Sequence, residues 1–136
     1  MAPPTPLSIA TQSVNRLVKE EAYYHKEQAS QEKRIAKLKQ DIKTTKPAEL
    51  DSNAEYMLKQ EQTALEETKN VFAPLLERIE EAVAKLEEQI AISESDGAAS
   101  EEELKKAREA LENGQKVGVT PDEQVAEGEK GDKEEI

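Results

Sequence analysis

The sequence predicts an all-α protein: an elongated, antiparallel three-helix bundle with coiled-coil-like packing, followed by a disordered acidic C-terminal tail. Its 136 residues include only 5 Gly and 6 Pro, whereas Ala, Glu, Lys, Gln and Leu recur throughout, a composition typical of helices. Apolar residues recur at spacings of three and four in three separate stretches, which is the period of amphipathic helices. Only 35% of the residues are hydrophobic and 3% aromatic, too few for a deep globular core but enough for the seam of a helix bundle.

The first helix is predicted at about residues 7–46. A heptad seam, with apolar or neutral residues at most a and d positions, continues over about four repeats. No Gly or Pro interrupts it, and Pro47 ends it because the residue before a proline avoids the α-helical conformation. The seam residues are Val14, Leu17, Glu21, Tyr24, Gln28, Gln31, Ile35, Leu38 and Ile42.

The second helix is predicted at about residues 52–92. Ser52 and Glu55 have the spacing of a capping box, in which each side chain satisfies a backbone N–H group at the helix start. Pro74 falls inside the pattern, where a proline removes one hydrogen bond and crowds the preceding turn. Because the stripe keeps its phase across the proline, we expect one helix that is kinked near Pro74. The stripe consists of Leu58, Glu61, Leu65, Thr68, Phe72, Leu75, Ile79, Ala82 and Leu86.

The third helix is predicted at about residues 101–113 and is short. The dipeptide Asp96-Gly97 indicates a turn before it, and Ser100 and Glu103 again have capping-box spacing. The dipeptide Asn113-Gly114 is a typical helix end. The apolar stripe of this helix consists of Leu104, Ala107 and Leu111.

Residues 1–114 are therefore expected to form one three-helix domain, and residues 115–136 a tail. The tail has three Lys against seven Asp and Glu, together with three Gly and one Pro, and it shows no apolar periodicity. Such a segment buries too little apolar surface to offset its loss of conformational entropy on ordering. We expect it to be disordered.

The helix–helix register also follows from the sequence. If the first turn centres near Pro47, residues that face each other across the antiparallel seam have numbers that add to about 96. Leu17 then faces Ile79, and Gln28 faces Thr68, so the middle of the seam is polar. The third helix is expected to cover the more apolar end, which leaves a less stable two-helix arm at the turn end.

The charge distribution excludes several classes of partner. A net charge of −11 argues against nucleic-acid and anionic-membrane binding, since both depend on Lys and Arg. Residues 16–46 are the exception, with nine Lys and Arg against five Asp and Glu. The N-terminus has no signal-peptide pattern, and no stretch approaches the ~20 apolar residues that cross a bilayer. We expect a soluble protein that is not secreted.

Little in the sequence predicts chemistry. His25 is the only histidine, and Glu21 lies four residues before it on the same helical face. Metal sites in helix bundles need histidines and carboxylates from several helices, and no Cys, phosphate-binding loop or nucleophile motif is present. We expect His25 to be exposed or to lie at the edge of the seam, and we predict no enzyme activity, no catalytic residue, no metal and no cofactor.

A family resemblance is carried by the first helix. Residues 14–27, with the sequence VNRLVKEEAYYHKE, resemble helix 1 of the tubulin-binding cofactor A family, also called tubulin-specific chaperone A. The most specific part is Arg16-Leu17-x-Lys19-Glu20-x-x-x-Tyr24. The resemblance continues through Pro74 to the short helix ending near Leu111.

The resemblance implies a non-catalytic three-helix bundle that binds and stabilises quasi-native β-tubulin. In that role it receives β-tubulin after release from the chaperonin and passes it towards the α/β-tubulin heterodimer. The implied partner is β-tubulin, with other tubulin-folding cofactors as further partners, and the implied location is the cytoplasm, in association with the cytoskeleton. We expect a monomer.

A contact surface is predicted on the first helix, because a chaperone with a net charge of −11 can meet acidic tubulin only through local complementarity. The predicted partner-binding residues are Arg16, Lys19, Tyr23, Lys26, Arg34 and Lys37. Two alternatives remain open. The basic residues could instead complement acidic residues of the second helix, and the protein could be a generic coiled-coil structural or adaptor protein that self-associates through its seam.

Overall fold

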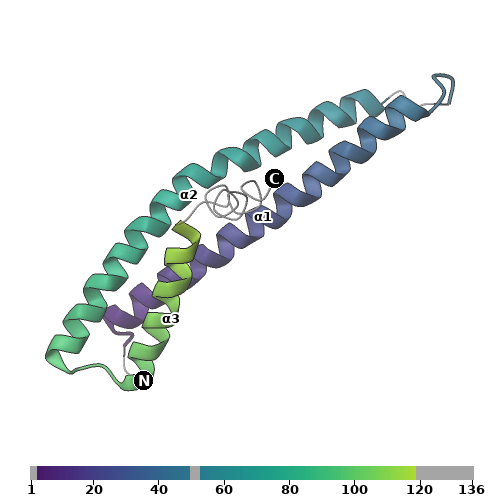
Figure 1. The fold of residues 1–136 in the computed structure, drawn as a ribbon. Helices are drawn as coiled ribbons and strands as arrows, with labels where there is room; N and C mark the ends of the chain where they lie inside the picture. The colour runs from purple at the N-terminus through teal and green to yellow at the C-terminus, as the bar shows by residue number, and fades with distance from the viewer. Residues whose placement is uncertain (1–2, 50–52, 119–136) are drawn as a thin grey trace, which may run out of the picture. The chain divides into compact units, whose positions relative to one another are not determined.

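The computed structural model describes residues 3–49 and 53–118, which form three α-helices. They are α1 (Pro6–Thr44), α2 (Ala54–Asp96) and α3 (Glu101–Gly118), labelled in Figure 1. No strand occurs in these two ranges. The predicted all-α, three-helix class is therefore confirmed, whereas residues 119–136 of the predicted tail lie outside the described residues.

The helix ends follow local chemistry. Pro6 is the first residue of α1, a position where a proline loses no helical hydrogen bond. The Thr5 hydroxyl accepts a hydrogen bond from the Ser8 N–H at 3.0 Å, as a helix N-cap does. At the other end α1 stops at Thr44, close to Pro47. Both ends agree with the prediction to within two residues, the precision with which helix ends are defined.

α2 runs as one helix through Pro74, as predicted. It begins at Ala54, directly after Asn53, whereas the predicted cap Ser52 lies outside the described residues. Its C-terminal end is four residues later than predicted, at Asp96, because no helix-breaking residue precedes Gly97. Gly97 has a φ of 67°, the left-handed conformation that ends many helices. The kink near Pro74 stays a prediction.

Contacts divide the chain into two compact units. The three-helix unit comprises Met1–Lys19 and Leu76–Ile136, and so contains the start of α1, the second half of α2 and α3. The two-helix unit, Glu20–Leu75, contains the rest of α1 and α2 with the turn between them. This division agrees with the predicted three-helix core and two-helix arm.

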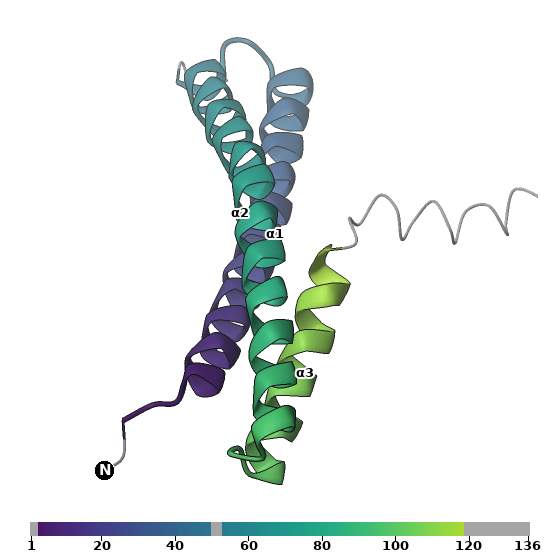
Figure 2. The ribbon, with the colours of Figure 1, turned by 90° about the vertical axis from the view of Figure 1, so that its left-hand side faces the viewer.

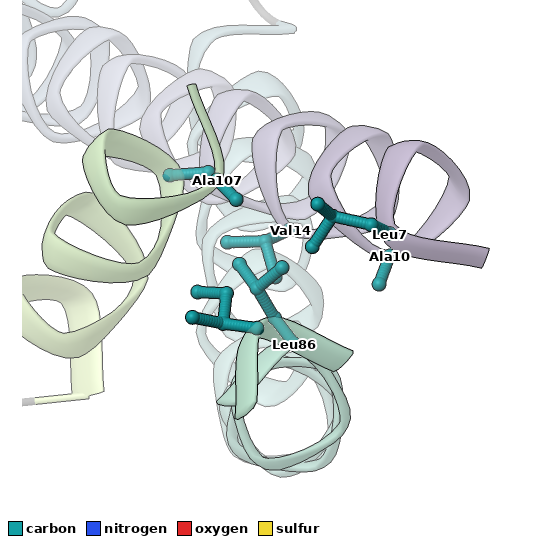
Figure 3. Packing of buried hydrophobic residues seen from close by; sticks show 7 residues of the cluster. Leu7, Ala10, Val14, Leu86 and Ala107 are labelled. Carbon is teal, nitrogen blue, oxygen red and sulfur yellow. The ribbon is translucent and has the colours of Figure 1, made fainter. Parts of the chain in front are cut away.

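The core of the three-helix unit combines large side chains from α1 and α2 with small ones from α3. Val14 and Leu86 are fully buried, and Ala107 of α3 lies against them (Figure 3). α3 runs alongside the second half of α2 (Figure 2). The buried cluster consists of Leu7, Ala10, Val14, Leu86, Ile90, Ala107 and Ala110.

The prediction that the third helix ends at residue 113 is wrong, because α3 continues to Gly118. Residues 115–118, predicted as the start of the tail, are therefore helical. Gly114 is buried, and a Cβ built on it would lie 2.6 Å from Cγ2 of Val83. This glycine permits a close approach of two helices and does not terminate one. At the other end of α3 the predicted cap is confirmed, since the Glu103 N–H donates to the Ser100 hydroxyl at 3.1 Å.

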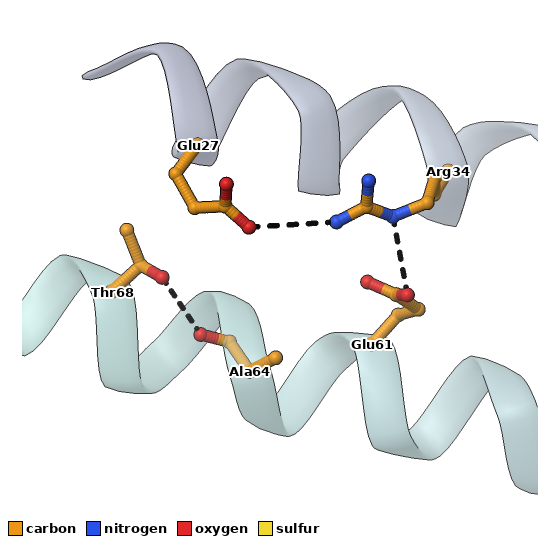
Figure 4. A network of polar contacts seen from close by, with 5 residues as sticks. All are labelled: Glu27, Arg34, Glu61, Ala64 and Thr68. Atoms are coloured by element: carbon orange, nitrogen blue, oxygen red, sulfur yellow. Dashed lines mark hydrogen bonds and ion pairs between the residues drawn. The ribbon is translucent and has the colours of Figure 1, made fainter. Parts of the chain in front are cut away.

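The two-helix unit confirms the predicted register. The rings of His25 and Phe72 stack with centroids 4.5 Å apart, and Arg34 contacts Glu61. In each pair the two residue numbers add to within one of 96, the sum predicted for residues that face each other. The predicted polar middle of the seam is also present: Gln31 and Thr68 are buried. The Thr68 hydroxyl donates to the Ala64 carbonyl of its own helix at 3.0 Å (Figure 4).

Candidate partner-binding surface

All six predicted partner-binding residues are exposed on α1. They are Arg16, Lys19, Tyr23, Lys26, Arg34 and Lys37. Tyr23 is 58% exposed and meets the half-buried Tyr24 edge to face, with ring centroids 5.3 Å apart. The expectation that Tyr24 lies in the seam and Tyr23 faces outwards is therefore confirmed.

Arg34 differs from the other five, because its charge already forms ion pairs within the two-helix unit. Its Nε donates to Oε1 of Glu61 on α2 at 3.1 Å, and its Nη2 lies 3.7 Å from Oε1 of Glu27 (Figure 4). The alternative reading, in which basic residues of the first helix complement acidic residues of the second, thus holds for Arg34. The Arg34 side chain is still 50% exposed, but its guanidinium is already partnered.

The other four cations of the predicted set differ from Arg34 in their surroundings. In the described part of the chain, Arg16, Lys19, Lys26 and Lys37 form no ion pair. Arg16 and Lys19 belong to the three-helix unit, and Lys26 and Lys37 to the two-helix unit, as does Tyr23. These residues occupy heptad positions c and f, the side of a helix that points away from its own seam. Their charges therefore remain available to another molecule.

The three-helix unit also contains a groove that the sequence reasoning missed. It lies between α1 and α2, has a volume of about 510 Å³, and includes Arg16 from the predicted set. Arg78 and Lys85 of α2 line it as well, both exposed. Their spacing of seven residues could have indicated this groove from the sequence, since it places two cations on one face of a helix that is acidic on balance.

A second exposed aromatic residue lies on α2, in the two-helix unit. Tyr56 is 62% exposed and its neighbour Met57 is 44% exposed. The Gln60 amide donates to the Tyr56 hydroxyl at 2.9 Å, which fixes the ring on the helix surface. Neither residue belongs to the apolar stripe of α2, so the periodicity did not select them.

His25 is accounted for by packing. Its Nε2 lies 3.0 Å from Oε1 of Glu21, and its ring stacks on Phe72. Its side chain is 40% exposed, so of the two expected positions, exposed or at the edge of the seam, the structure shows the second. Residues 3–49 and 53–118 contain no group of three or more His, Cys, Asp or Glu that could hold a metal ion. None of the three described helices is long and apolar enough to cross a membrane.

These features define a small helical-bundle protein whose candidate sites are exposed helix faces and a groove. Residues 2–111 match the family model described as tubulin binding cofactor A. The chain is also 39% identical over 84 residues to tubulin-specific chaperone A of Saccharomyces cerevisiae, a match that covers 62% of this chain and 71% of the relative. The chain belongs to the tubulin binding cofactor A family, as the resemblance of its first helix indicated. No solved structure matches it significantly.

Proposed function

We propose that this protein is a tubulin-folding chaperone that binds and stabilises quasi-native β-tubulin between the chaperonin and the α/β-tubulin heterodimer. The observation that carries the proposal is the family match over residues 2–111, which covers α1, α2 and the first part of α3. The name of the yeast relative, tubulin-specific chaperone A, supports the same role. The proposed location is the cytoplasm, in association with the cytoskeleton, with other tubulin-folding cofactors as further partners.

The proposed contact uses cations of α1 that form no ion pair with any residue the structure describes. At a net charge of −11, an acidic partner is repelled at long range, so binding needs a local surface of opposite sign. Lys19 and Lys26 are exposed and have no ion pair within the described ranges, so partner carboxylates displace no internal pair. Tyr23 adds an exposed aromatic side chain, a residue type enriched at binding hot spots.

A monomer is proposed, in preference to the self-associating coiled-coil adaptor. A coiled-coil adaptor needs a seam that is free to meet another chain. Here the seam is used internally: Val14, Ile35 and Leu86 are buried within one chain. Light scattering on the purified protein tests this, since a mass of about twice the 15.1 kDa of the chain would favour the adaptor.

The function is tested by mixing the protein with β-tubulin released from the heterodimer and measuring complex formation by size-exclusion chromatography with light scattering. A one-to-one complex is expected. The variant Lys19→Glu/Lys26→Glu should weaken it about tenfold or more, because like charges then face an acidic partner. The matched control, Lys59→Glu/Lys105→Glu, changes the net charge equally at exposed positions outside α1. Equal binding by both variants would reject the α1 surface, and no complex with the unmodified chain would reject the function.

A further inference from the structure

In the three-helix unit, α3 covers one side of the α1–α2 pair, and no other described element covers the opposite side. α3 packs on this pair through Ala107 and Ala110, whereas the groove of about 510 Å³ is lined by α1 and α2 alone. Ile9, at the rim of this groove, is 52% exposed although it is a large apolar residue. Leu17 and Ala82 line the same groove and are only partly buried. Its surface is therefore apolar where a further helix would pack.

The charged residues of the groove are mostly cations. Arg16 of α1 and Arg78 and Lys85 of α2 line it, against a single carboxylate, Glu81. Throughout the described ranges none of the three cations forms an ion pair or a hydrogen bond with another residue. A positive groove whose cations have no ionic partner among the described residues is unexpected in a chain with a net charge of −11. It fits a ligand that brings its own carboxylates.

We propose that this groove is a docking site for an acidic amphipathic helix of the tubulin partner. A helix that enters the groove between two others places its apolar i, i+3, i+4 and i+7 residues against the groove floor. Acidic residues on the flanks of that helix would then lie beside Arg16, Arg78 and Lys85. The inference rests on the proposed function and deepens it, because it names a second contact surface, on the α1–α2 groove, and the kind of segment that it takes.

Charge complementarity favours this occupant over a second copy of the chain. In a two-fold dimer the same patch would face itself, so the three cations would meet each other. Like charges placed directly opposite each other disfavour association. The C-terminal segment 119–136 is acidic in sequence, with seven Asp and Glu against two Lys, and is the internal competitor that the experiment must distinguish.

The first test reverses the two groove cations of α2 in the full-length chain. Arg78→Glu/Lys85→Glu should weaken binding to β-tubulin about tenfold or more, and the affinity of the unmodified chain should fall as salt rises. The control Lys59→Glu/Lys105→Glu has the same net charge and should bind within about twofold of the unmodified chain. Circular dichroism confirms that both variants remain helical. Groove variants that bind as tightly as the control would overturn the inference.

The second test identifies the occupant directly. A photo-crosslinking amino acid, benzoylphenylalanine, replaces the exposed Ile9, with the same replacement at exposed Lys105 as control. Mass spectrometry of the illuminated complex should find an acidic helical segment of β-tubulin joined at position 9. Crosslinks only to residues 119–136, only to a second copy, or to no tubulin segment in a complex that does form would each overturn the inference.

The two proposals fail in different ways. If the unmodified chain forms no complex with β-tubulin, the chaperone function fails and the docking site fails with it. If the unmodified chain forms the complex while the groove variants and position 9 behave as their controls, the function stands and only the groove is rejected.

Discussion

Gly114 of α3 lies so close to Val83 of α2 that a Cβ built on the glycine would be 2.6 Å from Cγ2 of the valine. The same Cβ would be 2.9 Å from Cγ1 of Val14 on α1. Real Cβ atoms do not approach other carbons so closely, so a larger residue would force movement. Val14 is fully buried, and β-branched side chains have few alternative rotamers. The third helix therefore packs against the first two at a position where only glycine fits.

Gly114→Ala is expected to destabilise the protein by roughly 1–2 kcal/mol, because overpacking in a closed core outweighs the gain in helix propensity of about 1 kcal/mol. Urea unfolding followed by circular dichroism measures this. The adjacent exposed residue provides the control: Asn113→Ala should leave stability unchanged or raise it slightly.

The cause can be isolated with a double-mutant cycle. Val83→Ala removes the methyl group that the new Cβ would meet, so Gly114→Ala should cost less in that background. An equal cost in both backgrounds would show that the contact between these positions is not responsible.

Gln31→Leu is expected to raise the free energy of unfolding by about 1 kcal/mol or more. Gln31 is 5% exposed, and its Oε1 accepts no hydrogen bond from the residues that the structure describes. A buried polar atom without a partner costs roughly 1–3 kcal/mol, which an apolar side chain of similar size avoids. Urea unfolding measures the change, and Gln12→Leu, at an exposed position of the same helix, should be nearly neutral.

A loss of stability in Gln31→Leu would mean that the amide contributes an interaction the protein needs. Light scattering on the same variant gives a second readout. If its mass doubles while that of Gln12→Leu does not, the polar middle of the seam serves to prevent self-association.

Arg34 and Lys37 should separate stability from binding. Arg34→Glu places a third carboxylate beside Glu27 and Glu61, so we expect a loss of about 1 kcal/mol, the upper range for exposed pairs. The double variant Arg34→Glu/Glu61→Arg should restore most of it. Lys37→Glu changes an exposed residue without an ion pair in the described chain, so its thermal midpoint should not move. A midpoint lowered equally by both single variants would contradict the distinction.

Backbone amides of the two-helix unit are expected to exchange with solvent faster than those of the three-helix unit. In the two-helix unit Gln31 and Thr68 interrupt the buried seam, whereas Val14 and Leu86 anchor a continuous apolar cluster in the three-helix unit. Fewer buried apolar contacts lower the free energy of local opening. Hydrogen exchange measured by mass spectrometry tests this, and equal protection of the two units would contradict it.

The seam and the register were predictable because they depend on local periodicity. Every a and d position named for the first helix, from Val14 to Ile42, is buried or half-buried, and so is the whole stripe of α2. His25 stacks on Phe72, in agreement with the predicted antiparallel register. The sequence also carried the family resemblance, since Arg16, Lys19 and Tyr24 occur in a specific order.

The candidate surface was predictable only in part. Periodicity placed Tyr24 in the seam and so turned its neighbour Tyr23 outwards, whereas Lys19 and Lys26 were selected for their charge; all three of the selected residues are exposed. Arg34 falls at heptad position g, beside the seam, rather than at c or f, but periodicity did not identify its partner Glu61, which comes from another helix and meets it only after the chain has folded back. The groove was missed for the same reason, since Arg16 and Lys85 lie on different helices.

The sequence by itself determined the number of helices, the faces they bury and the pairing of the first two, because helical period and helix-breaking residues act over a few neighbouring positions. Only the tertiary structure decided where α3 ends and which cations form ion pairs with other described residues. From its sequence neighbours alone, Gly114 is predicted to end the helix. The helix nevertheless continues, because only a residue without a side chain can pack this closely against Val14 and Val83. Contacts between residues distant in the chain outweigh a local preference of about 1 kcal/mol.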